Sequence, residues 1–204
     1  MLSIARPSYF CSNNMLEDLS PDELKKINSI GLEKRKKQYY CGRMTTKMAL
    51  SFFTGLIFRD VSVINEASGC PVIQNSPYAT SITHTNEIVA SLVFKREFSF
   101  GIDIENVRKS AINVLRSVIT VGDHVPDDLN CLTVAWTLKE ALTKALKCGF
   151  RLSLEELELT LLPQSANIFS CTYAKHPEFL GKARIYHNKS YAVAYPTSID
   201  IRKF

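Results

Sequence analysis

Hydrophobic and polar positions along the chain predict two successive series of helices followed by strands. At the start of the first series, Ser20 and Glu23 form the pattern of a helix capping box, and Gly31 is suited to end that helix. Apolar residues at helical spacing then predict a longer helix from Glu33 to about Phe58. The first half of the chain therefore begins with two helices.

Two runs after these helices have the pattern of strands. Residues 88–94 and 98–105 alternate between apolar and polar or stay apolar, and the charged residues 95–97 lie between them. This spacing predicts a hairpin of two neighbouring strands.

The second series repeats this order of elements. Residues 110–120 and about 128–148 have helical patterns, and Gly149 is a stop signal for the second of these helices. Runs rich in β-branched and aromatic residues then predict strands at 157–162, 167–173, 181–186 and 191–195. We therefore expect an α+β fold of two similar α+β subdomains, residues 1–106 and 107–204.

Composition and charge narrow the classes of function. Of the 204 residues, 46% are hydrophobic and 22% are charged, which suits a folded chain, and the formal charge of +5 favours anionic partners. No stretch approaches the roughly 20 apolar residues of a membrane span. Arg6 and Pro7 interrupt the start before a signal-peptide core could form, so we expect a cytoplasmic protein without a membrane segment. The common nucleotide-loop and serine-hydrolase motifs are absent from the sequence.

The strand pattern at 98–105 contains the first candidate site. Alternation along a strand places Asp103 and Glu105 on one face and the apolar residues on the other. Two carboxylates on one face suit a hard cation such as Mg²⁺, which takes its other ligands from water and a substrate phosphate. A solvated strand face with two surface acids would have the same pattern.

The helical pattern at 135–146 contains the second candidate site. Trp136, Glu140 and Lys144 follow one another at four-residue steps, with Lys139 beside them. Taken alone, this is also the pattern of an amphipathic helix with an exposed ion pair. Combined with the strand, it brings a third carboxylate and two lysines, a set of charges that suits phosphoryl transfer.

The two motifs in this order resemble a known signature. Residues 101–105 (Gly-Ile-Asp-Ile-Glu) and 136–144 (Trp-Thr-Leu-Lys-Glu-Ala-Leu-Thr-Lys) resemble the motif pair of 4′-phosphopantetheinyl transferases of the surfactin-synthetase-activating (Sfp) type. The similarity extends from about Leu19 to Tyr195. Weaker similarities to the family's Gly-Lys-Pro element, Ser-His-Ser element and basic helix lie at residues 69–73, 81–85 and 33–43.

The resemblance implies a pseudo-dimeric transferase fold, with the active site in the cleft between two similar subdomains that enclose coenzyme A. Asp103, Glu105 and Glu140 would bind Mg²⁺, or Mn²⁺ in its place, against the coenzyme A diphosphate. Lys139 and Lys144 would neutralise the phosphate oxygens. Glu140 would act as the base, with Lys144 and Asp103 as the other catalytic residues.

The resemblance also implies a site for the 3′-phosphate of coenzyme A. Without the family, a histidine between two threonines would more often be a hydrogen-bonded structural residue. Cys70 stands where the family has a lysine, which removes one cation from the coenzyme A site. The residues expected to bind the 3′-phosphate end are His84, Thr85, Lys34, Lys37 and Arg43.

The implied reaction transfers the 4′-phosphopantetheine arm of coenzyme A to a serine of an acyl or peptidyl carrier protein and releases 3′,5′-ADP. Glu140 would take the serine proton directly or through a water. Carrier proteins of this kind are acidic, so a chain of charge +5 should attract them. We expect a monomer that serves polyketide, nonribosomal peptide or siderophore synthesis.

Two other hypotheses remain open at this point. A transferase relative that binds carriers without reacting is suggested by Cys70 alone, and the three carboxylates argue against it. A non-enzymatic nucleic-acid binder has no recognised motif in its favour. Its basis is the group of basic and aromatic residues Lys25, Lys26, Lys34 to Lys37, Tyr39, Tyr40, Arg43 and Lys47.

Overall fold

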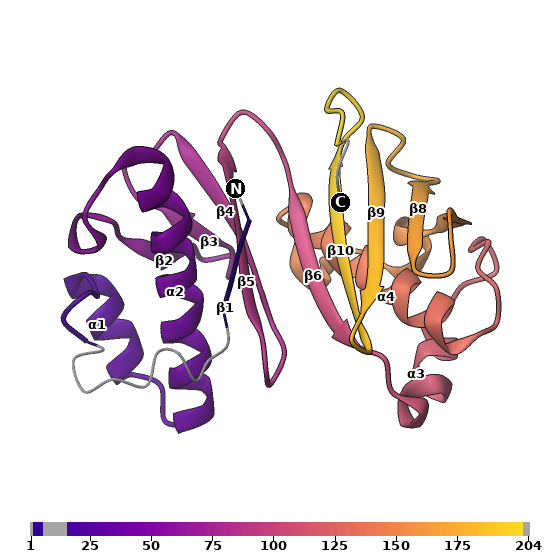
Figure 1. The fold of residues 1–204 in the computed structure, drawn as a ribbon, viewed down its shortest axis with the longest axis horizontal. Coiled ribbons are helices and arrows are strands. Elements are labelled where there is room, and N and C mark those ends of the chain that lie inside the picture. Colours follow the sequence, from indigo (N-terminus) through magenta and orange to yellow (C-terminus); the bar gives the residue numbers. More distant parts are fainter. Residues whose placement is uncertain (1, 6–15, 202–204) are drawn as a thin grey trace. The chain divides into compact units, whose positions relative to one another are not determined.

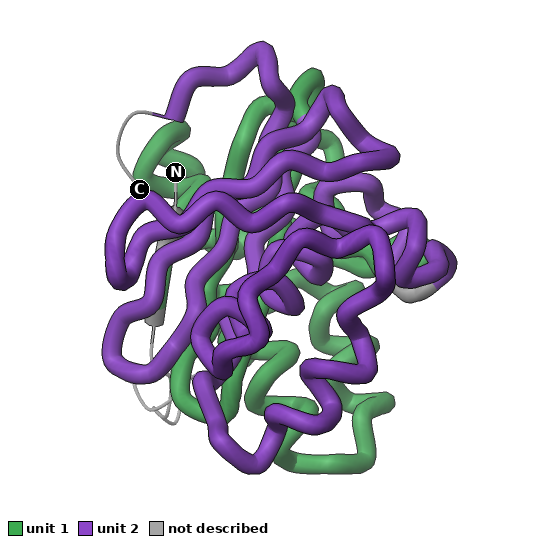
Figure 2. Tube along the Cα trace, turned by 90° about the vertical axis from the view of Figure 1, so that its right-hand side faces the viewer, with its two compact units in different colours: residues 1–98 green, residues 99–204 purple. Residues whose placement is uncertain are grey.

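The computed structural model describes residues 2–5 and 16–201, and it divides the chain into two compact units, residues 1–98 and 99–204 (Figure 2). Each unit combines helices with antiparallel strands, so the α+β class is confirmed. The division falls ahead of the boundary that we expected after Asn106, because strand β6 (Gly101–Asn106) pairs with the last strand of the second unit. The cleft expected between the halves stays a prediction.

The described part of the first unit combines the helices α1 and α2 and a short 3-10 helix with small antiparallel sheets (Figure 1). One sheet has the order β1-β5-β4, and a two-stranded sheet joins β2 to β3. In chain order the elements are β1 (Leu2–Ala5), α1 (Pro21–Asn28), α2 (Glu33–Thr54), the 3-10 helix η2 (Phe58–Asp60), β2 (Val63–Asn65), β3 (Pro71–Ile73), β4 (Tyr78–His84) and β5 (Val89–Lys95).

Local residues explain where α1 begins and where α2 ends. The capping box of Ser20 and Glu23 is formed, which confirms that prediction. Helix α2 begins at Glu33 as expected, but it ends at Thr54 because Gly55 adopts a left-handed backbone with φ of 70°. Its buried face packs on α1 and on β5 (Figure 1).

The predicted hairpin between residues 88–94 and 98–105 is wrong. Strand β5 has β1 on one edge and β4 on the other, in register from Leu2 opposite Leu92 and from Tyr78 opposite Lys95. Both hydrogen-bonding edges of β5 are therefore occupied by strands of its own unit. Strand β6 pairs instead with β10, the strand Lys189–Pro196 near the end of the chain.

The second unit places one long helix against a five-stranded antiparallel sheet of order β6-β10-β9-β8-β7. Helix α4 begins after Asp128, whose carboxylate accepts hydrogen bonds from two backbone N–H groups of the first turn. The elements are β6, η3 (Lys109–Ala111), α3 (Ile112–Ser117), α4 (Leu129–Ala145), η4 (Gly149–Arg151), η5 (Leu154–Leu157), β7 (Leu159–Pro163), β8 (Ile168–Tyr173), β9 (Phe179–Tyr186) and β10.

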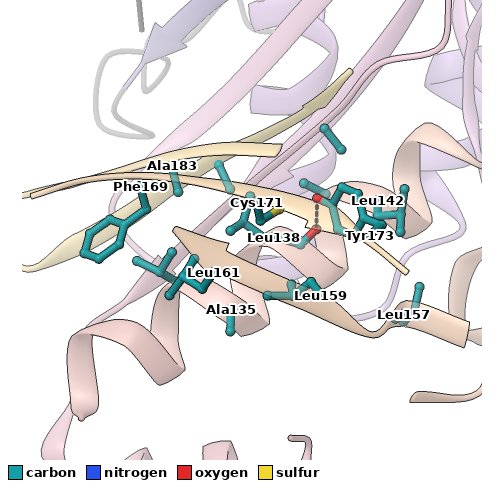
Figure 3. Packing of buried hydrophobic residues seen from close by; sticks show 14 of the residues in the cluster. Ala135, Leu138, Leu142, Leu157, Leu159, Leu161, Phe169, Cys171, Tyr173 and Ala183 are labelled. Carbon is teal, nitrogen blue, oxygen red and sulfur yellow. Dashed lines mark hydrogen bonds between the residues drawn. The ribbon is translucent and has the colours of Figure 1, made fainter. Parts of the chain in front are cut away.

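The core of the second unit lies between α4 and this sheet. Leu138 and Leu142 of α4 have no exposed surface and pack against side chains of β7, β8 and β9 (Figure 3). The hydroxyl of Tyr173 donates a hydrogen bond of 3.1 Å to the carbonyl oxygen of Leu138, which ties β8 to the helix. In the ranges 2–5 and 16–201, no helix has the length and apolarity that crossing a membrane requires.

Gly101 allows β6 to lie directly against α4. A Cβ at this position would lie 1.9 Å from the carbonyl oxygen of Ala141 and 2.5 Å from the backbone nitrogen of Ala145. Because backbone atoms of a packed helix cannot move aside, we expect Gly101→Ala to destabilise the protein by about 1–3 kcal/mol. The free energy of unfolding in urea measures this cost.

The matched control for Gly101→Ala is Gly31→Ala, where an added Cβ has nothing within 4 Å. There the change should be neutral or stabilising by about 0.4–1 kcal/mol, through the unfolded chain. Equal effects of the two substitutions would contradict the close approach of β6 to α4.

Candidate active site

Strand β6 directs two carboxylates toward α4. Asp103 lies opposite Ala192 in the ladder with β10, and Ala192 belongs to the core that α4 covers. Opposed residues of an antiparallel pair point to the same face, and residues two apart on a strand share a face, so Asp103 and Glu105 both face the helix. The predicted sharing of one strand face is confirmed. Because α4 covers this face, the alternative hypothesis of a solvated strand face with two surface acids does not hold.

Helix α4 supplies the facing side chains. Glu140 and Lys144 are one turn apart, and the ammonium nitrogen of Lys144 lies 2.6 Å from Oδ1 of Asp103. The Asp103 side chain is 7% exposed and that of Lys144 is 29% exposed, so this ion pair is shielded from water on the side of the strand. We call the group of Asp103, Glu105, Glu140 and Lys144 the acidic seam.

The carboxylates of the acidic seam are close enough to affect one another. Burial, and next the charge of Asp103, raises the pKa of Glu140 from 4.5 to about 7, although Lys144 acts in the opposite direction. Burial and Asp103 also raise the pKa of Glu105. Lys144 acts on both glutamates and Arg108 acts on Glu105 as well, but within the seam three acidic groups face one lysine. The seam therefore carries excess negative charge when all three are ionised. An added cation would relieve this repulsion.

The donor chemistry of the acidic seam fits a hard divalent cation. Carboxylate oxygens are the ligands that Mg²⁺ and Mn²⁺ prefer, and the repulsion between Glu140, Asp103 and Glu105 would be offset by positive charge. In the described part of the chain, no three His, Cys, Asp or Glu side chains converge on one point as a finished metal site. Binding of a cation would therefore require rotation of the flexible glutamate side chains.

Lys139 does not belong to the acidic seam, which corrects the role that we expected for it. Its side chain has no exposed surface, and its ammonium nitrogen lies 2.6 Å from Oδ2 of Asp123 and 3.3 Å from the carbonyl oxygen of Val118. Adjacent positions on a helix project about 100° apart, so Lys139 and Glu140 point to different neighbours. The ammonium of Lys139 thus holds the loop before α4 through Asp123 and Val118.

In the first unit, His84 and Arg43 line a common cavity of about 480 Å³. His84 is exposed at the end of β4, and Arg43 comes from the middle of α2. The structure thus brings together two of the residues that we expected at the 3′-phosphate. The full set of lining residues is Ile30, Arg35, Gln38, Tyr39, Gly42, Arg43, Ile82 and His84.

The guanidinium of Arg43 also has a structural role in this unit. Its Nε donates a hydrogen bond of 3.1 Å to the carbonyl oxygen of Val63, and a terminal nitrogen donates to the side-chain oxygen of Asn65. The same group stacks 3.9 Å from the centre of the Tyr39 ring. Arg43 therefore ties α2 to β2, and only part of its donor capacity faces the cavity.

The other residues expected at the 3′-phosphate lie elsewhere. Lys34 and Lys37 are exposed on α2 but do not line the cavity. The Thr85 hydroxyl is buried and accepts hydrogen bonds from the backbone of Glu87 and Ile88, so it holds the turn between β4 and β5. These assignments for Thr85, Lys34 and Lys37 are not supported by the geometry of the unit.

Sequence reasoning missed Arg35, Gln38 and Tyr39 as cavity residues. Within the basic run at residues 34–37, only Lys34 and Lys37 were expected to bind the 3′-phosphate. Together with Gly42 and Arg43, however, the cavity residues of α2 follow helical steps of three and four, which place them on one face. That periodicity was the available signal.

Comparisons with known proteins identify the family of this chain. The sequence profile of the 4′-phosphopantetheinyl transferase superfamily matches residues 99–196, which include the acidic seam. The holo-[acyl-carrier-protein] synthase of Staphylococcus carnosus (strain TM300) is 37% identical over 83 residues, which cover 37% of this chain and 71% of that protein. The structure of a holo-(acyl-carrier-protein) synthase from Bacillus anthracis str. Ames in complex with CoA (3′,5′-ADP) is 23% identical, with a TM-score of 0.40 over 45% of this chain and 90% of that chain. On the profile and the Staphylococcus relative, this chain belongs to the 4′-phosphopantetheinyl transferase superfamily.

Proposed function

We propose that this protein transfers the 4′-phosphopantetheine arm of coenzyme A to a serine of an acyl or peptidyl carrier protein. The observation that carries the proposal is the acidic seam, in which Asp103, Glu105, Glu140 and Lys144 meet between β6 and α4. The seam lies inside the stretch that matches the superfamily. A holo-[acyl-carrier-protein] synthase among the relatives supports the same reaction class.

The proposed step is a substitution at phosphorus. The serine oxygen of the carrier forms a bond to the β-phosphorus of coenzyme A. The bond from that phosphorus to the bridging oxygen of the diphosphate breaks, and 3′,5′-ADP leaves with the electron pair. Glu140 takes the serine proton, a role that suits a carboxylate placed beside Asp103 and Lys144 in the acidic seam.

The other residues of the seam position and neutralise the diphosphate. Mg²⁺ bound by Asp103, Glu105 and Glu140, or Mn²⁺ in its place, would supply positive charge against the phosphate oxygens. Lys144 is half-buried and pairs with Asp103 at 2.6 Å, so its ammonium is already directed into the seam. We propose that the ammonium of Lys144 leaves Asp103 and pairs with a phosphate oxygen when coenzyme A binds.

The cavity of the first unit is our candidate site for the 3′-phosphate of coenzyme A. His84 and Arg43 line it as the family resemblance implies, and Arg35 adds a second guanidinium. Arginine binds phosphate with two parallel hydrogen bonds, which the lysines of a charge run do not provide. Lys34 and Lys37 are exposed nearby on α2 and would contribute long-range attraction.

We further propose an Sfp-type transferase that acts as a monomer in polyketide, nonribosomal peptide or siderophore synthesis. The organisation of the chain in two units supports this proposal. The superfamily profile matches the second unit, and the first unit lies outside the match. The order of the motifs along the chain is the same as in that type. The formal charge of +5 suits an acidic carrier protein.

The direct test is the intact mass of an apo acyl carrier and an apo peptidyl carrier after incubation with the protein, coenzyme A and Mg²⁺. We expect a gain of one phosphopantetheine group on at least one carrier. EDTA and Asp103→Ala should abolish the gain, because Asp103 anchors both Lys144 and the proposed cation. The exposed Asp60→Ala variant is the matched control and should keep full activity.

Two outcomes would contradict the proposal. One is an unchanged mass for both carriers although coenzyme A binds. The other is an undiminished gain in the Asp103→Ala variant or in EDTA. If the mass gain appears, the carrier that is modified faster indicates whether the protein serves a pathway with peptidyl or with acyl carriers.

A further inference from the structure

Ser190 of β10 has a feature that the proposed reaction does not explain. Its side chain has no exposed surface, and its hydroxyl finds no hydrogen-bond partner within the described residues. A buried hydroxyl left without a partner costs about as much as a lost hydrogen bond, so folded proteins seldom keep one. An alanine would fill nearly the same space without that cost. The hydroxyl therefore needs an explanation outside the packing of the core.

The position of Ser190 in the sheet connects it to the acidic seam. It lies directly opposite Glu105 in the ladder between β6 and β10. Opposed residues of an antiparallel pair point to the same face, with Cβ atoms about 4.5–5.5 Å apart. Ala192 and Ala194 continue this face of β10, and both lie in the core beneath α4. The Ser190 hydroxyl therefore faces α4 at the point where the apolar face gives way to the carboxylates.

Glu105 is the residue of the acidic seam that lies directly across the ladder from this hydroxyl. Its carboxylate accepts a hydrogen bond from the backbone of Asn106, its own neighbour in sequence, and repulsion from Asp103 acts on it. Turning the carboxylate toward a cation in the seam would give up the local bond to Asn106. A serine hydroxyl directly across the ladder can replace that bond from the side of the sheet.

We infer that Ser190 is a positioning residue that donates a hydrogen bond to the Glu105 carboxylate when a divalent cation binds in the acidic seam. The inference rests on the proposed function, since it assumes that Asp103, Glu105 and Glu140 hold the cation. The hydroxyl would fix one oxygen of Glu105 and leave the other for the cation. Such outer partners of metal ligands are typically worth about 10- to 100-fold in metal affinity.

The test measures cation binding by the full-length protein without coenzyme A or carrier. Titration calorimetry with MnCl₂, and the rise of the thermal midpoint with MgCl₂, report the affinity of wild type and Ser190→Ala. We expect the dissociation constant to rise about tenfold in the variant. The midpoint without a cation should stay the same or rise, because a hydroxyl without a partner has been removed. Ser170→Ala is the matched control, since Ser170 lies in the same sheet but its hydroxyl is hydrogen-bonded to Gln164 and Leu162.

Three outcomes would overturn the inference. If Ser190→Ala binds the cation as tightly as wild type and Ser170→Ala, Ser190 has no role toward Glu105, while the proposed site survives. If Ser190→Ala lowers the midpoint without a cation and leaves the affinity unchanged, the hydroxyl belongs to the fold alone. If wild type itself binds neither cation, the metal site of the proposed function fails together with the inference.

Discussion

Glu140→Gln is expected to lower the rate of carrier modification by about 10²- to 10⁴-fold, the usual contribution of a positioned base. Glutamine keeps the size of the side chain but cannot take the serine proton. It also removes one carboxylate from the acidic seam, so the requirement for Mg²⁺ should rise. Both effects act on turnover, because Glu140 lies beside Asp103 and Lys144 in the acidic seam.

The same substitution should stabilise the protein above neutral pH when no divalent cation is present. The pKa of Glu140 is raised from 4.5 to about 7, mainly by burial. Between these two values the folded protein retains a proton that the unfolded chain has released, so the free energy of unfolding falls as the pH rises through this window. Glutamine has no proton to lose. The variant should therefore unfold at a higher temperature than wild type at pH values above about 7.

Turnover and thermal midpoints across this pH range check both halves of the prediction. The exposed Glu66→Gln variant is the matched control, and it should follow wild type in both measurements. Full turnover of Glu140→Gln would remove Glu140 from the role of base. Parallel pH profiles of the midpoints for wild type and Glu140→Gln would show that the carboxylate is not held in a site that raises its pKa.

Local signals in the sequence were sufficient to place the starts of three helices. The capping box of Ser20 and Glu23 is formed, and the helices at 33–54 and 129–145 begin within about one residue of their predicted starts. Strand pairing was different, because β6 and β10 are separated by the rest of the second unit. Nothing near residues 98–105 indicates that the partner of β6 is the strand at 189–196. The wrong hairpin followed from assuming that neighbouring strands pair.

The candidate site shows the same difference between local signals and contacts with distant segments. Asp103 and Glu105 share a face because strands have a period of two, and Glu140 and Lys144 share one because they are a helical turn apart. Spacing within one element therefore predicted each half of the acidic seam, and the family resemblance joined the two halves. The partner of Lys139 is Asp123, in the loop before α4, and no spacing rule connects a helix to its preceding loop. Lys139 was assigned by its place in a motif, and its contacts contradict that role.

Asp123 is the centre of a buried network in the second unit. Its Oδ2 accepts hydrogen bonds from the Lys139 ammonium at 2.6 Å and from the backbone and hydroxyl of Thr120 at 2.8 and 3.1 Å. Its Oδ1 accepts the backbone N–H of Leu159, the first residue of β7, at 2.9 Å. One carboxylate thus joins the loop before α4, the helix itself and the edge strand of the sheet. Both charged side chains of the pair have no exposed surface.

Removing either charge from this pair should therefore destabilise the protein, and the two single substitutions should differ. Asp123→Ala leaves the Lys139 ammonium buried with only the carbonyl oxygen of Val118, at 3.3 Å, so we expect a loss of about 3–5 kcal/mol. Lys139→Met leaves a carboxylate that keeps its bonds to Thr120 and Leu159, so the loss should be smaller. The double variant should cost less than the sum of the two, because it leaves no buried charge.

Urea unfolding followed by the fluorescence of Trp136 measures these losses where they arise, because Trp136 is the chain's single tryptophan and lies on α4. The matched control is the exposed pair of Arg116 and Asp127, whose removal should have a much smaller effect although its atoms are 2.8 Å apart. Additive losses at Asp123 and Lys139 would contradict the buried ion pair. Equal losses would contradict the view that Asp123, with its additional partners, tolerates isolation better than the lysine does.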